Sequence, residues 1–176
     1  QTFSGFTLLA STARMYNNRE PRFYATIGFC HSFWPGTSSS ENQYKNIEVT
    51  YYSDGYASAN PDHPEDYNRT GYTCVKYRHL EDEMKKGTVK AKYFPVFRYA
   101  ETLLNYAEAM NELGGPDYTA DELPISARTA LNKVRSAANM PDITDNGDDF
   151  TARLRNERRV ELAFEDHRFW DIRRWM

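Results

Sequence analysis

The sequence predicts a mainly α-helical protein whose helices lie in the second half of the chain. Two stretches, residues 95–113 and 124–138, repeat apolar side chains at helical spacing, and a third helix is expected after residue 146. Residues 1–92 lack this periodicity and are rich in Gly, Pro, Ser, Asn and Tyr, which indicates long loops with a few short strands. Helices joined by short turns in this order are compatible with a helical scaffold of the tetratricopeptide kind.

In the loop-rich, Tyr-rich region, residues 1–92, two segments are candidates for strands. They are Arg22–Phe29 and Ile47–Tyr52, and the second is rich in residues that favour β-structure. Loops as long as those in this region are usually either functional or disordered. The chain has 13 tyrosines, most of them before residue 100, and this aromatic content argues against disorder. We therefore expect this region to lie close to a ligand.

In the helical region, residues 93–176, the first helix is predicted to begin near Pro95 and to end at Gly114–Pro116. Its predicted apolar face consists of Tyr99, Leu103, Tyr106, Met110 and Leu113. A separate polar stripe on the same helix consists of Glu101, Asn105, Glu108 and Glu112.

The second helix is predicted to open near Pro124 and to close at Asn139–Pro141, with Thr119 and Glu122 at capping-box spacing before it. Its apolar face is predicted to consist of Ala127, Leu131, Val134 and Ala138. Residues 146–149 are predicted to cap the third helix, which contains the charged C-terminal segment.

The C-terminal segment is dense in charged and aromatic residues: from Glu157 to Trp175 it reads ERRVELAFEDHRFWDIRRW. This segment resembles the end of the conserved region in the SusD/RagB family, the outer-membrane nutrient-capture lipoproteins of Bacteroidetes-type bacteria. Residues 93–109 (YFPVFRYAETLLNYAEA) and, more weakly, residues 21–28 (PRFYATIG) are also similar to the family. One departure is Asp166, which stands where the family usually has glycine.

The resemblance implies a SusD-like fold, of which this chain is the C-terminal portion within one domain. It also implies non-catalytic binding of an oligosaccharide or polysaccharide at the cell surface, and delivery to a TonB-dependent, SusC-like transporter of the outer membrane. A signal peptide and a lipid-bearing cysteine, which would anchor the lipoprotein, are expected upstream of Gln1. Two alternatives stay open: capture of peptides, as in RagB-like proteins, and a helical-repeat module that binds another protein.

The ligand-binding residues predicted in the loops are aromatic side chains beside turn residues. A Tyr or Trp ring held on a loop can stack on the apolar face of a sugar, while nearby polar side chains bond its hydroxyls. On this basis the candidate ligand-binding residues are Trp34, Tyr51, Tyr52, Tyr56 and Asp54. Trp34 could equally fill a local core beneath the loops, and this alternative also stays open.

Carboxylates and arginines of the helical region are predicted to form a structural ion-pair network. Its predicted members are Glu101, Glu108, Glu157, Arg158, Arg159 and Glu161. Arg158 or Arg159 is expected to reach Glu101 or Glu108 across a helix interface.

A catalytic role is the alternative to this structural network, with Glu157 and Glu161 as the carboxylate pair of a glycoside hydrolase. Burial against arginines would hold both carboxylates ionised, which does not suit a general acid. His167 and Asp171 are four residues apart, and a structural hydrogen bond is expected there rather than a catalytic or metal pair.

Composition and motifs argue against several classes of function. A formal net charge of -3 argues against a broad nucleic-acid-binding surface. Cys30 and Cys74 are too few for a disulfide scaffold, so two free, buried thiols are expected, with a single disulfide between them as the alternative. The sequence has none of the common catalytic or nucleotide-binding patterns and no apolar run of transmembrane length. We therefore expect no enzyme, no catalytic residue, no cofactor and no metal.

Overall fold

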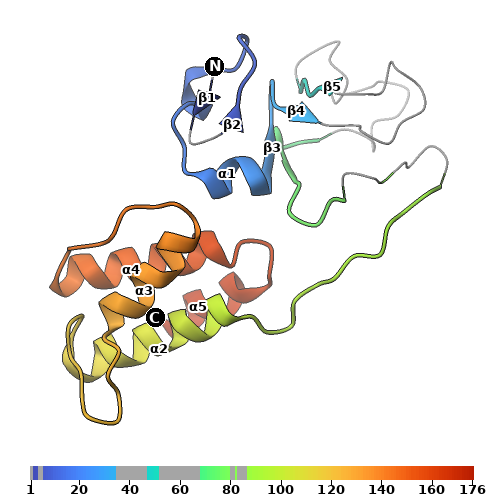
Figure 1. Cartoon of the computed structure of the whole chain (residues 1–176). Helices are drawn as coiled ribbons and strands as arrows, with labels where there is room; N and C mark the ends of the chain where they lie inside the picture. The colour runs from blue at the N-terminus through green and yellow to red at the C-terminus, as the bar shows by residue number, and fades with distance from the viewer. Residues whose placement is uncertain (1, 4–5, 35–46, 52–67, 80–81, 83–86) are drawn as a thin grey trace. The chain divides into compact units, whose positions relative to one another are not determined.

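The computed structural model in Figure 1 describes residues 2–3, 6–34, 47–51, 68–79, 82 and 87–176. The chain falls into two compact units, residues 1–94 and 95–176. The composition of the sequence changes near residue 92, close to the end of the first unit. Short strands occupy the first unit, and the long helices occupy the second.

The first unit is built on short strand pairs. The described strands pair antiparallel: β1 (Thr2–Phe3) with β2 (Phe6–Thr7), β3 (Ile27–Phe29) with β6 (Tyr72–Cys74), and β4 (Phe33–Trp34) with β5 (Ile47–Glu48). Two short helices, η1 (Arg14–Tyr16) and α1 (Pro21–Thr26), precede β3.

The strand predicted over Arg22–Phe29 is wrong in its first part, where the chain forms α1. Pro21 stands at the start of this helix, and its fixed φ suits the opening turn. The strand begins only at Ile27. The strand predicted over Ile47–Tyr52 is shorter than expected, because β5 ends at Glu48 and Tyr52 lies outside the described residues.

An aromatic cluster forms the core of the first unit. Leu8, Tyr16 and Phe29 are buried, and Phe23 and Tyr24 pack against them. The ring centroids of Tyr16 and Phe29 are 4.5 Å apart, and those of Phe23 and Phe29 are 5.2 Å apart. Because each ring removes a large apolar area from water, the cluster fixes β3, which leads through three residues into β4.

The described part of the second unit consists of α2 (Tyr99–Gly114), α3 (Ala127–Ala137), α4 (Gly147–Glu161) and α5 (His167–Arg174). α2 packs against α3 and α4 (Figure 1). Their buried side chains form one apolar core: Leu103, Leu104, Ala107, Met110, Ala127, Ala130, Leu131, Val134, Ile143, Phe150, Leu154 and Leu162. The prediction of helices in this half of the chain is confirmed.

The buried face of α2 differs from the predicted one. Leu103 and Met110 are buried as expected, but Tyr99 is 69% exposed and Leu113 is 62% exposed. Leu104 and Ala107, both fully buried, take their place. Small residues such as Ala107 let two helices approach closely, a requirement that apolar periodicity alone does not reveal.

The helix starts also differ from the predicted ones. α2 begins at Tyr99 rather than near Pro95, which is exposed and lies outside the helix. α3 begins at Ala127, and its cap is Ser126, whose Oγ accepts from the N–H of Thr129 at 3.2 Å. The predicted capping box before Pro124 is therefore wrong.

A turn over residues 162–166 divides the C-terminal segment between α4 and α5. Phe164 has φ of 64° and Asp166 has φ of 61°, the left-handed conformation that residues with a Cβ rarely adopt. Asp166 directly precedes the first residue of α5. Asp166, the residue that departs from the family pattern, thus has a backbone conformation that glycine adopts easily.

Replacing Asp166 by glycine is expected to leave the free energy of unfolding unchanged or to raise it by up to about 1 kcal/mol, because glycine adopts a positive φ without steric cost. Asp166→Ala, which keeps the Cβ and removes the carboxylate, is the matched control and should lower the free energy of unfolding. Urea unfolding of the three proteins measures the difference. A clear loss for Asp166→Gly would show that the carboxylate itself contributes to stability.

Candidate functional site

Two of the predicted ligand-binding residues, Trp34 and Tyr51, lie within the described ranges. Trp34 ends β4 and is paired with Ile47 of β5. Tyr51 is half-buried and lies four residues beyond Ile47, which corresponds to at most about 14 Å of extended chain. Tyr51 therefore lies beyond the end of β5, close to the strand pair that contains Trp34 but outside it. Outside the described residues lie the other three candidates, Tyr52, Asp54 and Tyr56.

A β-bulge shapes the strand that ends at Trp34. The N–H of His31 donates to the carbonyl of Val49 at 2.7 Å, and the N–H of Val49 donates to the carbonyl of Ser32 at 3.0 Å. Two residues thus oppose one, and His31 has the positive φ, 65°, that one class of bulge requires. Ser32 is buried, and its Oγ accepts from the N–H of Phe29 at 3.1 Å. These bonds fix the backbone from which Trp34 extends.

Tyr51 is anchored to β6. Its hydroxyl forms a hydrogen bond with Oγ1 of Thr73. Asn68 closes the turn before β6, because its Oδ1 accepts from the N–H groups of Thr70 and Gly71, each at 2.8 Å. The bond to Thr73 holds the ring of Tyr51 in one orientation.

One phenol of the aromatic cluster has altered acidity. Burial, followed by a hydrogen bond and electrostatic repulsion from Tyr72, raises the pKa of Tyr16 from 10.0 to about 12. Tyr51 and Cys30 add to the repulsion. Tyr16 therefore stays neutral at pH values where an exposed tyrosine ionises.

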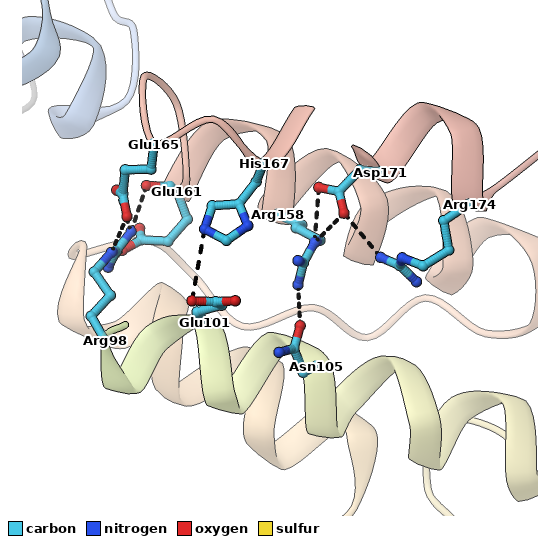
Figure 2. A network of polar contacts seen from close by, with 9 residues as sticks. All are labelled: Arg98, Glu101, Asn105, Arg158, Glu161, Glu165, His167, Asp171 and Arg174. Carbon is cyan, nitrogen blue, oxygen red and sulfur yellow. Dashed lines mark hydrogen bonds and ion pairs between the residues drawn. The ribbon is translucent and has the colours of Figure 1, made fainter. Parts of the chain in front are cut away.

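Polar side chains of the second unit meet between α2 and the C-terminal segment. Figure 2 shows all of them except Glu108, pointing toward one another from α2 and the residue before it, from α4, and from the turn and helix that follow α4. We call this set the α2–α5 network, and its members are Arg98, Glu101, Asn105, Glu108, Arg158, Glu161, Glu165, His167, Asp171 and Arg174.

Arg98, the residue before α2, holds two carboxylates of the C-terminal segment (Figure 2). It donates to Oε1 of Glu161 at 2.6 Å and to the two oxygens of Glu165 at 2.7 and 2.9 Å. Burial opposes the charge of Arg98, but the bonds from Glu165 and Glu161 raise the pKa of its guanidinium above the usual range. The planar fork of arginine suits this paired geometry.

Arg158 is the buried centre of the network. Its Nε lies 2.8 and 2.9 Å from the two oxygens of Asp171, and its Nη1 donates to Oδ1 of Asn105 at 2.5 Å. The side chains of Arg158 and Asp171 are only 7% and 4% exposed. The prediction that Arg158 reaches Glu101 or Glu108 is therefore wrong, because Asp171 supplies the carboxylate and the amide of Asn105 accepts another N–H.

Glu101 and Glu108 contact the last helix and the residue after it. Nε2 of His167 lies 3.7 Å from Oε2 of Glu101. Arg174 donates to both oxygens of Glu108, and the indole N–H of Trp175 donates to Oε1 at 2.6 Å. Burial raises the pKa of Glu108, but these donors outweigh it and the pKa falls below its usual value. The polar stripe of α2 is thus the contact surface of the C-terminal segment.

The other predicted network members lie elsewhere. Glu157 is buried and accepts from Nη1 of Arg135 on α3 at 2.6 Å. Arg159 is exposed, with no ion pair among the described residues. Glu157 and Glu161 each lie against an arginine, an arrangement that favours carboxylates accepting bonds rather than donating a proton.

Sequence reasoning left six members of these ion pairs out of the network: Arg98, Arg135, Glu165, His167, Asp171 and Arg174. The regular spacing of Glu157, Glu161 and Glu165 indicated carboxylates in need of cations. Their partners could not be found from spacing, because Arg98 is separated from Glu161 and Glu165 by 63 and 67 residues.

Cysteines, metals and membrane spans add few constraints. Cys30 and Cys74 are both free; Cys30 is partly buried, and Cys74, the last residue of β6, is exposed rather than buried as predicted. Across the described ranges, no group of three or more His, Cys, Asp or Glu side chains is arranged to hold a metal ion. No described helix has the length and apolar character needed to cross a membrane.

Asp171→Ala is expected to lower the free energy of unfolding by about 3–5 kcal/mol, because it leaves the buried guanidinium of Arg158 without a carboxylate. Glu161→Ala is the matched comparison and should cost less, since Arg98 keeps both oxygens of Glu165. Chemical denaturation measures both losses. Equal losses would contradict a central role for the Arg158–Asp171 pair.

The folded protein is expected to lose stability as the pH rises from 10 to 12. Below pH 10, Tyr16 is protonated in both the folded and the unfolded chain. Between its two pKa values only the unfolded chain releases the proton, which costs up to about 3 kcal/mol of stability. Thermal unfolding at a series of pH values should show a flatter decline for Tyr16→Phe than for Tyr118→Phe, a control at a more exposed tyrosine. The same decline in both variants would show that Tyr16 is not responsible.

Comparison with known sequences places the chain beside one family. A model of the SusD family matches residues 9–176. SusD-like protein P38 of Formosa agariphila is 30% identical over 178 residues, covering 82% of this chain and 35% of that protein.

Solved structures give the same result. A SusD-like protein from Bacteroides fragilis matches with 33% identity and a TM-score of 0.72, over 92% of this chain and 29% of that one. A SusD-like carbohydrate binding protein from the same species matches with 26% identity and a TM-score of 0.67, over 99% of this chain and 33% of that one. The chain thus spans about a third of the length of these relatives.

Proposed function

Because this chain belongs to the SusD family, we propose that it takes part in binding an oligosaccharide at the cell surface and makes or breaks no bond in it. The ligand is proposed to meet the first unit, while the helical unit serves as a scaffold. The binding energy would come from stacking of sugar rings on aromatic side chains and from hydrogen bonds to sugar hydroxyls.

The likeness to the SusD-like carbohydrate binding protein of Bacteroides fragilis is the observation that carries this proposal. It extends over 99% of the chain, so the loop-rich unit as well as the helical unit has a counterpart there. The two units are therefore expected to work within one carbohydrate-binding architecture.

Within the first unit, Trp34 and Tyr51 are the described candidates for ligand contact. The bulge at His31 fixes the backbone before Trp34, and the bond to Thr73 holds the ring of Tyr51. A ring that is already held, as that of Tyr51 is, loses little side-chain entropy when a sugar stacks on it. We propose that three residues outside the described ranges add further contacts: Tyr52, Asp54 and Tyr56.

We further propose that the bound sugar passes to a TonB-dependent, SusC-like transporter, and that the whole protein is a surface lipoprotein of the outer membrane. Family membership supports both statements. Glycoside hydrolysis by Glu157 and Glu161 is disfavoured, because each of these carboxylates lies against an arginine. The resulting proposal is a binding protein with no cofactor.

Trp34→Ala is expected to weaken glycan binding several-fold or more, since stacking on an aromatic ring contributes about 0.5–1.5 kcal/mol beyond the area it buries. The experiment is a glycan array followed by calorimetry on any glycan that binds, with the 176-residue chain and its variant side by side. Trp170→Ala is the matched control, because Trp170 is a 67% exposed tryptophan of the helical unit.

A loss confined to Trp34→Ala would support the loop site, and equal binding by both variants would contradict it. Peptides are screened on the same chain. Binding of peptides without binding of any glycan would favour the RagB-like alternative. Circular dichroism of each variant separates a lost contact from a lost fold.

A further inference from the structure

Asn146 and Gly147 form the start of α4 and have unusual surroundings. This is the one Asn-Gly sequence in the chain. Both residues are exposed. Asn146 is the N-cap residue of α4, yet its side chain makes no capping bond to the helix. Gly147 has φ of 54°, and the space around its missing side chain is open.

The side chain of Asn146 is turned toward Arg128 instead. Its Oδ1 accepts from Nη2 of Arg128 at 2.6 Å. Arg128 is itself fixed, because it donates to the two carboxylate oxygens of Asp117 at 2.7 and 2.8 Å and to the carbonyl of Asp145 at 2.7 Å. A held cation therefore polarises the side-chain carbonyl of Asn146 and can stabilise negative charge that develops on its oxygen.

The N–H of Gly147 is at the start of a helix, where N–H groups have no acceptor within the helix. Among the described residues no hydrogen bond occupies it. This nitrogen is the atom that must lose its proton and attack the side chain of the preceding asparagine for a cyclic imide to form. Glycine also offers no side chain to hinder that approach.

We propose that Asn146 is a site of spontaneous deamidation in the folded protein. The backbone nitrogen of Gly147 loses its proton to base and bonds to Cγ of Asn146. The side-chain nitrogen then takes up a proton from solvent, its bond to Cγ breaks, and it leaves as ammonia. Water then opens the resulting succinimide at either carbonyl. One opening gives aspartate, and the other gives isoaspartate, in which the backbone runs through the former side chain.

Asn139 is the natural internal comparison. It is exposed and has a positive φ, 55°, but the residue after it is Met140. The N–H of Met140 donates to the carbonyl of Arg135 at 2.9 Å, so this nitrogen is occupied. Deamidation is therefore expected at Asn146 and not at Asn139.

The two products are expected to affect α4 in opposite ways. Aspartate at position 146 keeps the backbone, pairs with Arg128 and places negative charge at a helix N-terminus, where it is favourable. Isoaspartate lengthens the backbone directly before Gly147 and displaces the first turn of the helix. Accumulation of isoaspartate should therefore lower the thermal unfolding midpoint.

The test is incubation of the folded 176-residue chain at neutral and mildly alkaline pH, followed by peptide mass spectrometry and enzymatic methylation of isoaspartate. A synthetic peptide of residues 142–150 is incubated in parallel. We expect a gain of mass equal to the exchange of an amide NH2 for a hydroxyl at Asn146 alone, at a rate that rises with hydroxide concentration. Conversion of the peptide with no change at Asn146 of the folded chain would overturn the proposal, as would equal conversion at Asn139.

Two variants separate chemistry from stability. Asn146→Gln retains an amide but requires a larger, slowly formed ring, so it should show no conversion and no loss of midpoint with time. Asn146→Asp has the charge of one product on a normal backbone, and its midpoint should equal or exceed that of the fresh protein. If the thermal unfolding midpoint of Asn146→Gln fell during incubation as much as that of the unchanged chain, the loss of stability could not be assigned to Asn146.

Discussion

The helical unit depends on one buried guanidinium. Arg158 joins α4 to α5 through Asp171 and to α2 through Asn105, and both charged side chains are almost completely shielded from water. A charge is stable in such a place only when its counter-charge and its remaining hydrogen-bond partners are present. Apolar surfaces alone would allow α5 several positions against α2. We attribute its one position to Arg158, supported by Arg98 at the start of α2 and by the Arg174–Glu108 pair.

Much of this fold could be predicted from the sequence, because helices and their resemblance to a family are encoded locally. Apolar spacing located α2 and α3, and the segment from Glu157 to Trp175 indicated the SusD family, which the family match and the solved structures confirm. Local patterns failed to predict which residues are buried or paired where that depends on helix packing or on contacts between segments far apart in the sequence. Leu104 and Ala107 are buried because α3 approaches closely, and Arg158 bonds to Asp171 and Asn105 rather than to a glutamate of α2.

The candidate ligand site was less predictable for the same reason. A sequence shows that Trp34 and Tyr51 stand among turn residues, but it does not show the two-against-one pairing at Val49 that fixes the backbone before Trp34. Nor does it show that the hydroxyl of Tyr51 bonds to Thr73, a residue of β6 that lies 22 positions along the chain. These contacts depend on strand pairing between distant segments, for which a single sequence gives only weak signals.

The separation along the chain between Arg98 and its partners affects how the protein is made. A ribosome releases α2 and α3 while the residues that will neutralise Arg98 and cover the polar stripe of α2 are still unsynthesised. The α2–α3 pair is a local contact, whereas the bonds from Arg98 close loops of 63 and 67 residues and are therefore slower to form. A nascent chain that stops before Asp171 would contain every residue of the apolar core of the helical unit. It would lack the carboxylate of Asp171, which neutralises Arg158. For cellular quality control, such a product would be distinguished from the finished protein by misplaced charge rather than by exposed hydrophobic surface.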